Sequence, residues 1–174
     1  MIKFPLVVFF CLTNLLTANI MGLETPKEVD SLQVEQTVTT QAVKPAKKNV
    51  VVPSNAKCPQ WWQTAVDAGW AKKELPMLDM IINRESKCLP KALNSQDPNT
   101  VDGIKGSLGL TQLNAFWVQS TTYYPEGYLQ SLGVVGNIRD LYDPYLNLRS
   151  ALEVWKYGEA KHGCGWKAWA TPCN

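Results

Sequence analysis

The sequence predicts a mainly α-helical domain with a small β part, of the α+β class. Residues 74–86 and 143–163 both carry apolar side chains at the three- and four-residue spacing of a helix that covers a core. Between them, residues 89–107 are rich in Asn, Asp, Gly and Pro, which favours a loop or a small β-hairpin. We therefore expect helices on either side of one turn-rich segment.

The N-terminal part of the chain is predicted to lie outside this domain. Residues 1–22 have one lysine, an apolar run too short to span a bilayer, and small residues near the end, which is typical of a secretory signal peptide. An uncleaved anchor is the alternative, because the small residues do not form an ideal cleavage site. Residues 23–57 contain no aromatic residue and no sustained apolar period, which favours a flexible tether. We expect an exported protein of the periplasm, cell wall or extracellular space.

The predicted domain covers residues 58–174. All seven tryptophans of the chain fall between Trp61 and Trp169, and a chain of this length is long enough for one core and too short for two. From residue 58 onward, eleven Lys and Arg balance eleven Asp and Glu. Basic residues are not concentrated in any segment of the domain, which argues against nucleic acid as a partner.

The four cysteines of this domain predict two disulfides, because an even number in an exported chain indicates an oxidising compartment. Three pairings of Cys58, Cys88, Cys164 and Cys173 are possible. Zinc is the competing interpretation, but the spacings are wide and His162 is the only histidine. We predict no metal and no cofactor.

The first helix is expected just after Cys58, with Pro59 in its first turn and Gly69 at its end. The second is residues 74–86, in which one face carries Leu75, Leu78, Ile81, Ile82 and Glu85. If these helices form an antiparallel hairpin, the start of the first lies beside the end of the second. This arrangement favours pairing Cys58 with Cys88, and therefore Cys164 with Cys173.

The rest of the domain alternates turns and helices. In residues 89–107 we expect reversals at Asp97-Pro98-Asn99 and Asp102-Gly103, which are residue types that favour turns. Calcium binding is the alternative role for these aspartates, and it is disfavoured because their spacing misses the calcium-loop pattern. A helix is expected over 110–119, followed by a turn-rich stretch, 121–137, whose tyrosines at 123, 124 and 128 are candidates for the wall of a groove. The longest helix is expected to start at Asp143 and to align Tyr145, Leu148, Leu152 and Trp155 on one face.

Glu85 is the candidate for chemistry. A carboxylate on the core side of a helix loses solvent, which favours its protonated form, and such a group is suited to act as a general acid. The alternative is a partly exposed helix-end residue paired with Arg84 or Lys87.

Three motifs stand in order along the domain: Glu85-Ser86, then "GSLGLTQ" at 106–112, then "DPYLNL" at 143–148. Together they resemble the lysozyme-like lytic transglycosylase family, which includes the soluble lytic transglycosylases and their goose-type lysozyme relatives. The resemblance runs from about Pro59 to Trp169 and looks closest to a secreted, tryptophan-rich branch. Two positions depart from the family pattern: Thr111 stands where methionine is usual, and the block that often supplies a tyrosine near the glutamate is replaced, at best, by Tyr157.

This resemblance implies a lysozyme-like fold in which a catalytic helix and the turn-rich segment line a sugar-binding groove. It implies an enzyme that cleaves the β-1,4 bond between N-acetylmuramic acid and N-acetylglucosamine in peptidoglycan, with Glu85 as acid and base and a 1,6-anhydro end as product. Gly106 and Gly109 would let the backbone approach the sugar. Substrate contacts are expected from Ser86, Ser107, Gln112, Trp117 and Tyr157. The partner would be the glycan strand, and the protein a monomer.

Three alternatives remain. A lysozyme-type hydrolase needs a second carboxylate, for which Asp97 and Asp102 are the candidates. A Cys/His amidase would use a free Cys88 or Cys164 with His162. A non-catalytic peptidoglycan-binding module would keep the groove without the acid's function.

Overall fold

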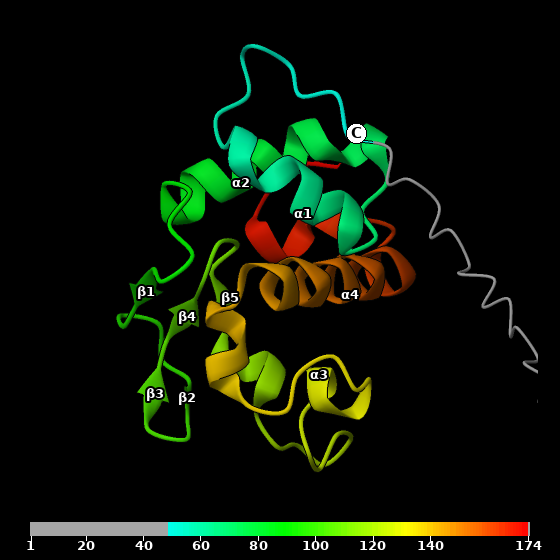
Figure 1. The fold of residues 1–174 in the computed structure, drawn as a ribbon. Coiled ribbons are helices and arrows are strands. Elements are labelled where there is room, and N and C mark those ends of the chain that lie inside the picture. The colour runs from blue at the N-terminus through cyan, green and yellow to red at the C-terminus, as the bar shows by residue number, and fades with distance from the viewer. Residues whose placement is uncertain (1–48, 174) are drawn as a thin grey trace, which may run out of the picture. The chain divides into compact units, whose positions relative to one another are not determined.

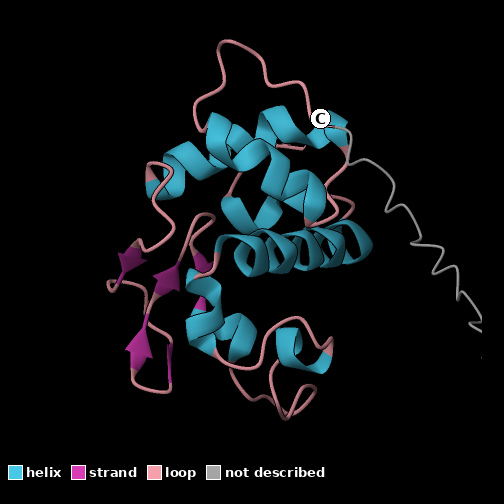
Figure 2. Cartoon of the chain, in the orientation of Figure 1, coloured by secondary structure: helices cyan, strands magenta, loops and turns pink. Residues whose placement is uncertain are grey.

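Helices are the most abundant secondary structure (Figure 2) in this computed structural model, which describes residues 49–173. With a few short antiparallel strands, it is an α+β fold. In chain order the α-helices and 3-10 turns (η) are η1 (Pro59–Trp61), α1 (Trp62–Asp67), η2 (Lys72–Glu74), α2 (Leu75–Ser86), η3 (Ala115–Val118), α3 (Tyr128–Ser131), η4 (Ile138–Tyr142), α4 (Pro144–His162) and η5 (Gly165–Trp169). The predicted first helix, the predicted helix over 74–86 and the predicted long helix from Asp143 are therefore present, as η1 with α1, as α2 and as α4.

The strands occupy one edge of the structure (Figure 1). They are β1 (Leu93–Asn94), β2 (Thr100–Val101), β3 (Ile104–Lys105), β4 (Ser107–Leu108) and β5 (Leu113–Asn114). β2 and β3 form the expected hairpin, which reverses at Asp102-Gly103, and β1, β4 and β5 form a three-stranded antiparallel sheet in the order β1-β4-β5. The segment 93–114 is thus a small β part in contact with η3.

The start of the first helix lies beside the end of α2, as predicted for an antiparallel helix hairpin. Cys58, just before η1, is bonded to Cys88, just beyond α2, and their Cα atoms lie 5.6 Å apart. Cys164 is bonded to Cys173 over the same Cα separation of 5.6 Å, which is typical of disulfides. The pairing expected from the hairpin is confirmed. It also leaves neither Cys88 nor Cys164 as the free thiol that a Cys/His amidase requires.

α4 is the central helix, against which α1, η4 and η5 pack (Figure 1). Its cap is as predicted, because the Asp143 carboxylate accepts a hydrogen bond from the Leu146 amide at 2.9 Å. Leu148 and Leu152 are buried, but Tyr145 is 45% exposed, so the prediction that it shares the core face was wrong. Tyr145 lies in the first turn of α4.

The predicted helix over 110–119 was also wrong. Residues 109–112 form a tight turn, β5 follows, and only the short η3 is helical. Gly109 has φ 76° and Gln112 has φ 50°, both in the left-handed region, which a continuous helix does not accommodate. Asn114 then starts η3 by accepting a hydrogen bond from the Phe116 amide at 2.9 Å.

The predicted signal peptide, and most of the predicted tether, lie outside the described residues. The last residues of the tether segment contact the domain, since the Val50 amide donates to the Gln63 side chain at 2.9 Å and the Lys57 amide to Asp79 at 2.6 Å. Within residues 49–173 there is no helix long and apolar enough to cross a membrane.

Candidate active site

A cavity of about 360 Å³ opens between the end of α2, the β part and η5. Its lining is polar for the most part. Two of the three sequence motifs, at 85–86 and 106–112, contribute residues to it, whereas the third, at 143–148, does not, and residues 168–170 of the C-terminal segment complete the lining. The residues that line it are Glu85, Asn94, Asp97, Ser107, Gln112, Leu113, Asn114, Trp117, Ala168, Trp169 and Ala170. Four of the predicted site residues, Glu85, Ser107, Gln112 and Trp117, therefore meet at one cavity.

Glu85 lies at the edge of the buried face of α2 and not within it, so the expectation of a buried acid was wrong. Its side chain is 25% exposed and forms an ion pair with Arg84 at 2.7 Å. Arg84 donates two hydrogen bonds to Glu85, from Nε and Nη2, and both go to the Oε1 atom of the carboxylate. Among the described residues Oε2 has no hydrogen-bond partner, so one carboxylate oxygen is available to a ligand in the cavity.

The buried carboxylate of α2 is Asp79, only 5% exposed. It accepts hydrogen bonds from the amides of Lys57 and Cys58, at 2.6 and 2.8 Å, and from the indole of Trp62 at 2.9 Å. These three donors satisfy the carboxylate and fasten the chain before η1 to α2. Asp79 is thus structural. Sequence reasoning missed it, because an isolated Asp on a helix gives no sign of the donors that face it.

Arg84 connects Glu85 to the C-terminal segment. Its Nη2 donates to the carbonyl oxygen of Trp169 at 2.5 Å, and its Nη1 to the hydroxyl of Thr171 at 3.3 Å. Trp169 is in turn fixed by a hydrogen bond from its indole to the carbonyl of Thr111 at 2.7 Å. Three parts of the chain that are distant in sequence therefore hold the Glu85 side of the cavity.

The β side of the cavity is held by a polar network. The hydroxyl of Ser107 donates to Asp97, and the side-chain Nδ2 of Asn114 donates to the same hydroxyl oxygen at 3.3 Å. The oxygen of Asn114 accepts from the side chain of Asn99 at 2.8 Å. Asp97, the candidate second carboxylate, therefore lies in the same cavity as Glu85, whereas Asp102 is exposed at the β2–β3 turn and does not line it.

Gln112 is held in place by its own neighbours. Its side-chain nitrogen donates to the carbonyls of Ala92 and Gly109, at 3.2 and 3.0 Å, which leaves the side-chain oxygen as the polar atom free of described partners. This Gln112 orientation depends on the turn 109–112. Gln112 is therefore better suited to accept a hydrogen bond from an amide or hydroxyl of a ligand than to donate one.

The glycines of "GSLG" make room for the protein and not for a sugar, contrary to expectation. A Cβ on Gly109 would overlap the side-chain amide of Asn147 and the Leu141 carbonyl, and one on Gly106 would overlap the Asn94 carbonyl. Asn147 is fully buried and accepts from the amide and hydroxyl of Thr111, at 3.0 and 2.7 Å. Thr111, which stands where the family pattern has methionine, is buried as well and does not line the cavity.

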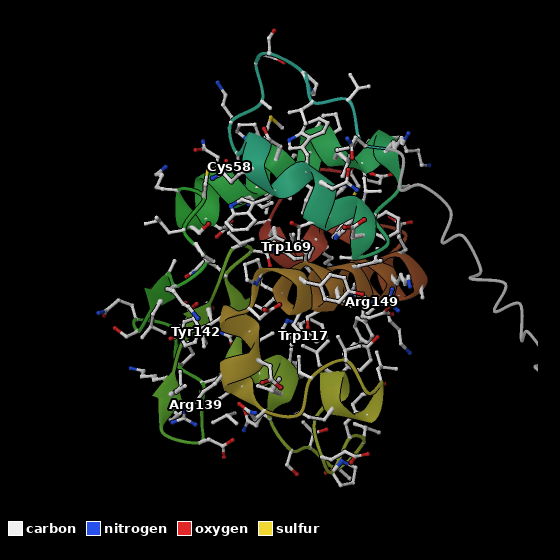
Figure 3. The ribbon with its side chains drawn as sticks, viewed as in Figure 1. Cys58, Trp117, Arg139, Tyr142, Arg149 and Trp169 are labelled. Atoms are coloured by element: carbon white, nitrogen blue, oxygen red, sulfur yellow. A yellow bond between two sulfur atoms is a disulfide. The ribbon has the colours of Figure 1, made fainter. Side chains whose placement is uncertain are left out.

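Two predicted contact residues do not line the Glu85 cavity. Ser86 is buried, and its hydroxyl donates to the Ile82 carbonyl at 2.9 Å, one turn back along α2. Tyr157, on α4, packs edge-on against Trp117 with ring centroids 5.5 Å apart and lines an adjoining aromatic pocket. Figure 3 labels Trp117 and Trp169, the two tryptophans of the Glu85 cavity.

Sequence reasoning did not single out six of the residues that line the cavity, among them the polar Asn94 and Asn114 and the aromatic Trp169. Asn94 and Asn114 belong to β1 and β5, where the sequence predicted a loop or small β-hairpin and a helix, respectively. Trp169 is buried, packs against Trp166 and also lines the cavity. Comparisons of the chain with protein-family models, with curated proteins and with solved structures found no match.

Proposed function

We propose that this chain is a lytic transglycosylase of lysozyme-like fold, a lyase that cleaves the β-1,4 bond between N-acetylmuramic acid and N-acetylglucosamine in peptidoglycan. The observation that carries the proposal is the position of Glu85 at the end of α2, in a cavity with one carboxylate oxygen free. The motifs around residues 85, 106–112 and 143–148 support the same assignment.

The cavity suits a neutral, hydroxyl-rich ligand. Asn94, Ser107, Gln112 and Asn114 offer amide and hydroxyl groups, and Trp117 offers an aromatic ring. Acetamido and hydroxyl groups of an amino sugar are recognised by such groups, because each can donate or accept a hydrogen bond as required.

The chemistry that we propose needs one carboxylic acid. Protonated Glu85 donates its proton to the glycosidic oxygen, and the bond from that oxygen to C1 of the muramic acid breaks, which leaves an oxocarbenium-like centre. The C6 hydroxyl oxygen of the same sugar then bonds to C1, and Glu85 accepts the hydroxyl proton. The products are a free N-acetylglucosamine end and a 1,6-anhydro end, no water is consumed, and Glu85 is again protonated.

One observation favours a second candidate, a lysozyme-type hydrolase of the same bond. Asp97 lines the same cavity as Glu85, and in a hydrolase it would be the second carboxylate, the one that activates water. Its hydrogen bond from Ser107, however, also gives it a structural role in the β part. The two reactions differ in product: water gives a reducing end and the C6 hydroxyl gives an anhydro end.

The enzyme proposal is tested by lysis of purified peptidoglycan with the full chain and with Glu85→Gln. We expect Glu85→Gln to abolish lysis and to retain sedimentation with the glycan. Glu126→Gln is the matched control, because Glu126 is exposed and lines none of the cavities described above. Binding with no lysis by the unmodified chain would instead indicate a non-catalytic wall-binding module.

A further inference from the structure

The Cys164–Cys173 disulfide closes a loop that forms one side of the Glu85 cavity. Cys164 immediately precedes η5, and Cys173 lies 9 residues further along the chain. Residues 168–170, inside this loop, line the cavity, while η5, red in Figure 1, packs on α4. One covalent bond therefore joins the two ends of a segment that belongs to the candidate active site.

The same loop holds Glu85 in place through Arg84. Within the loop, the Trp169 carbonyl accepts a hydrogen bond from Arg84 at 2.5 Å and the Thr171 hydroxyl accepts one at 3.3 Å. Arg84 in turn donates two hydrogen bonds to Oε1 of Glu85. Thr171 is two residues from Cys173 in the sequence. The orientation of Glu85 thus depends, through Arg84, on a segment whose end is fixed by the disulfide.

The backbone of Ala170, between these two acceptors, is strained. Its φ of 49° lies in the left-handed region, where Cβ comes close to the following carbonyl oxygen. A residue other than glycine keeps such a conformation only where the surrounding structure imposes it. The constraints that flank Ala170 include the two hydrogen bonds from Arg84 and the disulfide. We therefore expect the loop to leave this conformation when the disulfide is opened.

The end of the loop is loosely packed. Pro172 and Cys173 are exposed, and both line a further cavity of about 370 Å³, to which α4 contributes Trp155 and Glu159. A segment that borders a cavity has few buried contacts to lose, so it can open locally while the core stays folded. The position of this segment consequently depends on the covalent bond at its end.

The two disulfides differ in their exposure to a reductant. Cys173 is exposed, whereas Cys58 is fully buried and Cys88 is half-buried. In thiol–disulfide exchange an attacking thiolate must reach one of the two sulfur atoms. Of the two bonds, Cys164–Cys173 is therefore the one that a reductant reaches more easily.

We propose that the Cys164–Cys173 disulfide is a redox switch that controls the position of Arg84 and thereby of Glu85. The intact bond holds the active arrangement, and its reduction lowers activity while the rest of the fold remains. This inference rests on the proposed function, because it concerns the regulation of the same site.

The reductant is a dithiol. One of its thiolates attacks Sγ of Cys173, the S–S bond breaks, and Sγ of Cys164 leaves as a thiolate that takes up a proton. The second thiolate of the reductant then displaces Sγ of Cys173, which takes up a proton as well. The protein gains two thiols, and the dithiol is oxidised to a disulfide.

The first test does not depend on activity. The full chain is incubated with dithiothreitol under native conditions, free thiols are alkylated at intervals, and mass spectrometry identifies the labelled cysteines. We expect Cys164 and Cys173 to be labelled before Cys58 and Cys88, with the circular dichroism of the helices unchanged at that point.

The rate of this reduction also tests the link to Arg84, because coupling between two sites is reciprocal. Arg84→Ala removes the two hydrogen bonds that hold the loop and should accelerate the reduction of Cys164–Cys173 roughly 2- to 10-fold. Arg139→Ala is the matched control, since Arg139 is exposed and lines none of the cavities described above. It should leave the rate unchanged.

The second test compares peptidoglycan lysis by the oxidised and the reduced chain. Reduction should lower kcat roughly 3- to 30-fold, with KM little changed. The variant Cys164→Ser/Cys173→Ser should show the lower kcat without any reductant. Because Arg84 transmits the effect, Arg84→Ala should be insensitive to reduction. A disulfide that only stabilises the fold would instead lower the activity of the parent and of Arg84→Ala alike.

The outcomes for the switch are separable from those for the enzyme. The switch is overturned if Cys58–Cys88 is reduced first, if Arg84→Ala is reduced at the rate of the parent, or if lysis by the oxidised chain persists unchanged after reduction. No lysis by the oxidised chain, together with reduction that is accelerated by Arg84→Ala, would refute the enzyme and support the link between the disulfide and Arg84.

Discussion

Arg84 donates two hydrogen bonds to a single oxygen of its neighbour Glu85, from Nε at 2.9 Å and from Nη2 at 2.7 Å. The same guanidinium reaches the Trp169 carbonyl and the Thr171 hydroxyl. Arg84 thus determines which oxygen of Glu85 is left without a partner among the described residues, and it ties that orientation to the C-terminal segment.

Replacement of Arg84 is expected to affect catalysis more than stability. Arg84→Ala should lower kcat about 10- to 100-fold, because the acid is no longer held in one orientation, while KM changes little. The ion pair is partly exposed, so the free energy of unfolding should change by less than about 1 kcal/mol. Steady-state kinetics on peptidoglycan and urea unfolding measure both. Arg84→Lys retains the charge with fewer donors and should fall between the parent and Arg84→Ala; equal kcat for all three would contradict the positioning role.

Asp79 is predicted to be the structurally critical acid of α2. Asp79→Ala would leave three buried donors, from Lys57, Cys58 and Trp62, without their acceptor. We expect the free energy of unfolding to fall by about 3 to 5 kcal/mol, as measured by urea unfolding. Asp102→Asn, at the exposed left-handed position of the β2–β3 turn, should change it by less than about 0.5 kcal/mol. Similar losses in both variants would refute the role assigned to Asp79.

The two disulfides are expected to contribute unequally to stability. Cys58 and Cys88 are 30 residues apart and Cys164 and Cys173 are 9 apart, so the first pair restricts the unfolded chain more. On the chain-entropy account, its loss should cost roughly 4 kcal/mol and loss of the second pair roughly 3 kcal/mol. Double alanine variants of each pair, compared by denaturant unfolding, test the order. A larger loss from the Cys164–Cys173 pair would show that native contacts around Arg84 outweigh chain entropy.

Tyr128 should contribute to alkaline sensitivity. Burial and nearby Glu153 raise its pKa above the ordinary 10.0, so the folded protein holds this proton more tightly than the unfolded chain. The resulting stabilisation is fully present below pH 10.0 and is lost as the pH rises through the folded-state pKa. Urea unfolding across this range should show a shallower loss of stability for Tyr128→Phe than for the parent. Parallel curves would indicate that Tyr128 titrates alike in both states.

Much of the fold followed from local signals. Pro59 and Pro144 in first turns and the apolar spacing of 75–82 predicted α1, α2 and α4, and the helix hairpin predicted the disulfide partner of Cys58. The segment 110–119 was misjudged because its apolar residues have a helical spacing, while the left-handed turn at Gly109 and Gln112 depends on the distant Asn147 and Leu141. Contacts between residues so far apart in the sequence leave no pattern in the sequence around either residue.

The candidate site was predictable only in part, because sequence motifs identify residues but do not show the contacts that these residues form in the fold. Glu85, Ser107, Gln112 and Trp117 came from motifs and meet at one cavity. Ser86 was misplaced, because its hydroxyl is used one turn back along its own helix. The depth of Glu85 was misjudged since helical spacing fixes the direction of a side chain, whereas its exposure depends on Arg84 and the C-terminal segment that it contacts.

The most direct test of the account is mass spectrometry of the fragments that the full chain releases from purified peptidoglycan, with Glu85→Gln alongside. The account predicts fragments that end in 1,6-anhydro-N-acetylmuramic acid from the unmodified chain and no fragments from Glu85→Gln. Reducing ends that disappear in Asp97→Asn would contradict it, because they would make water the acceptor and Asp97 the group that activates it.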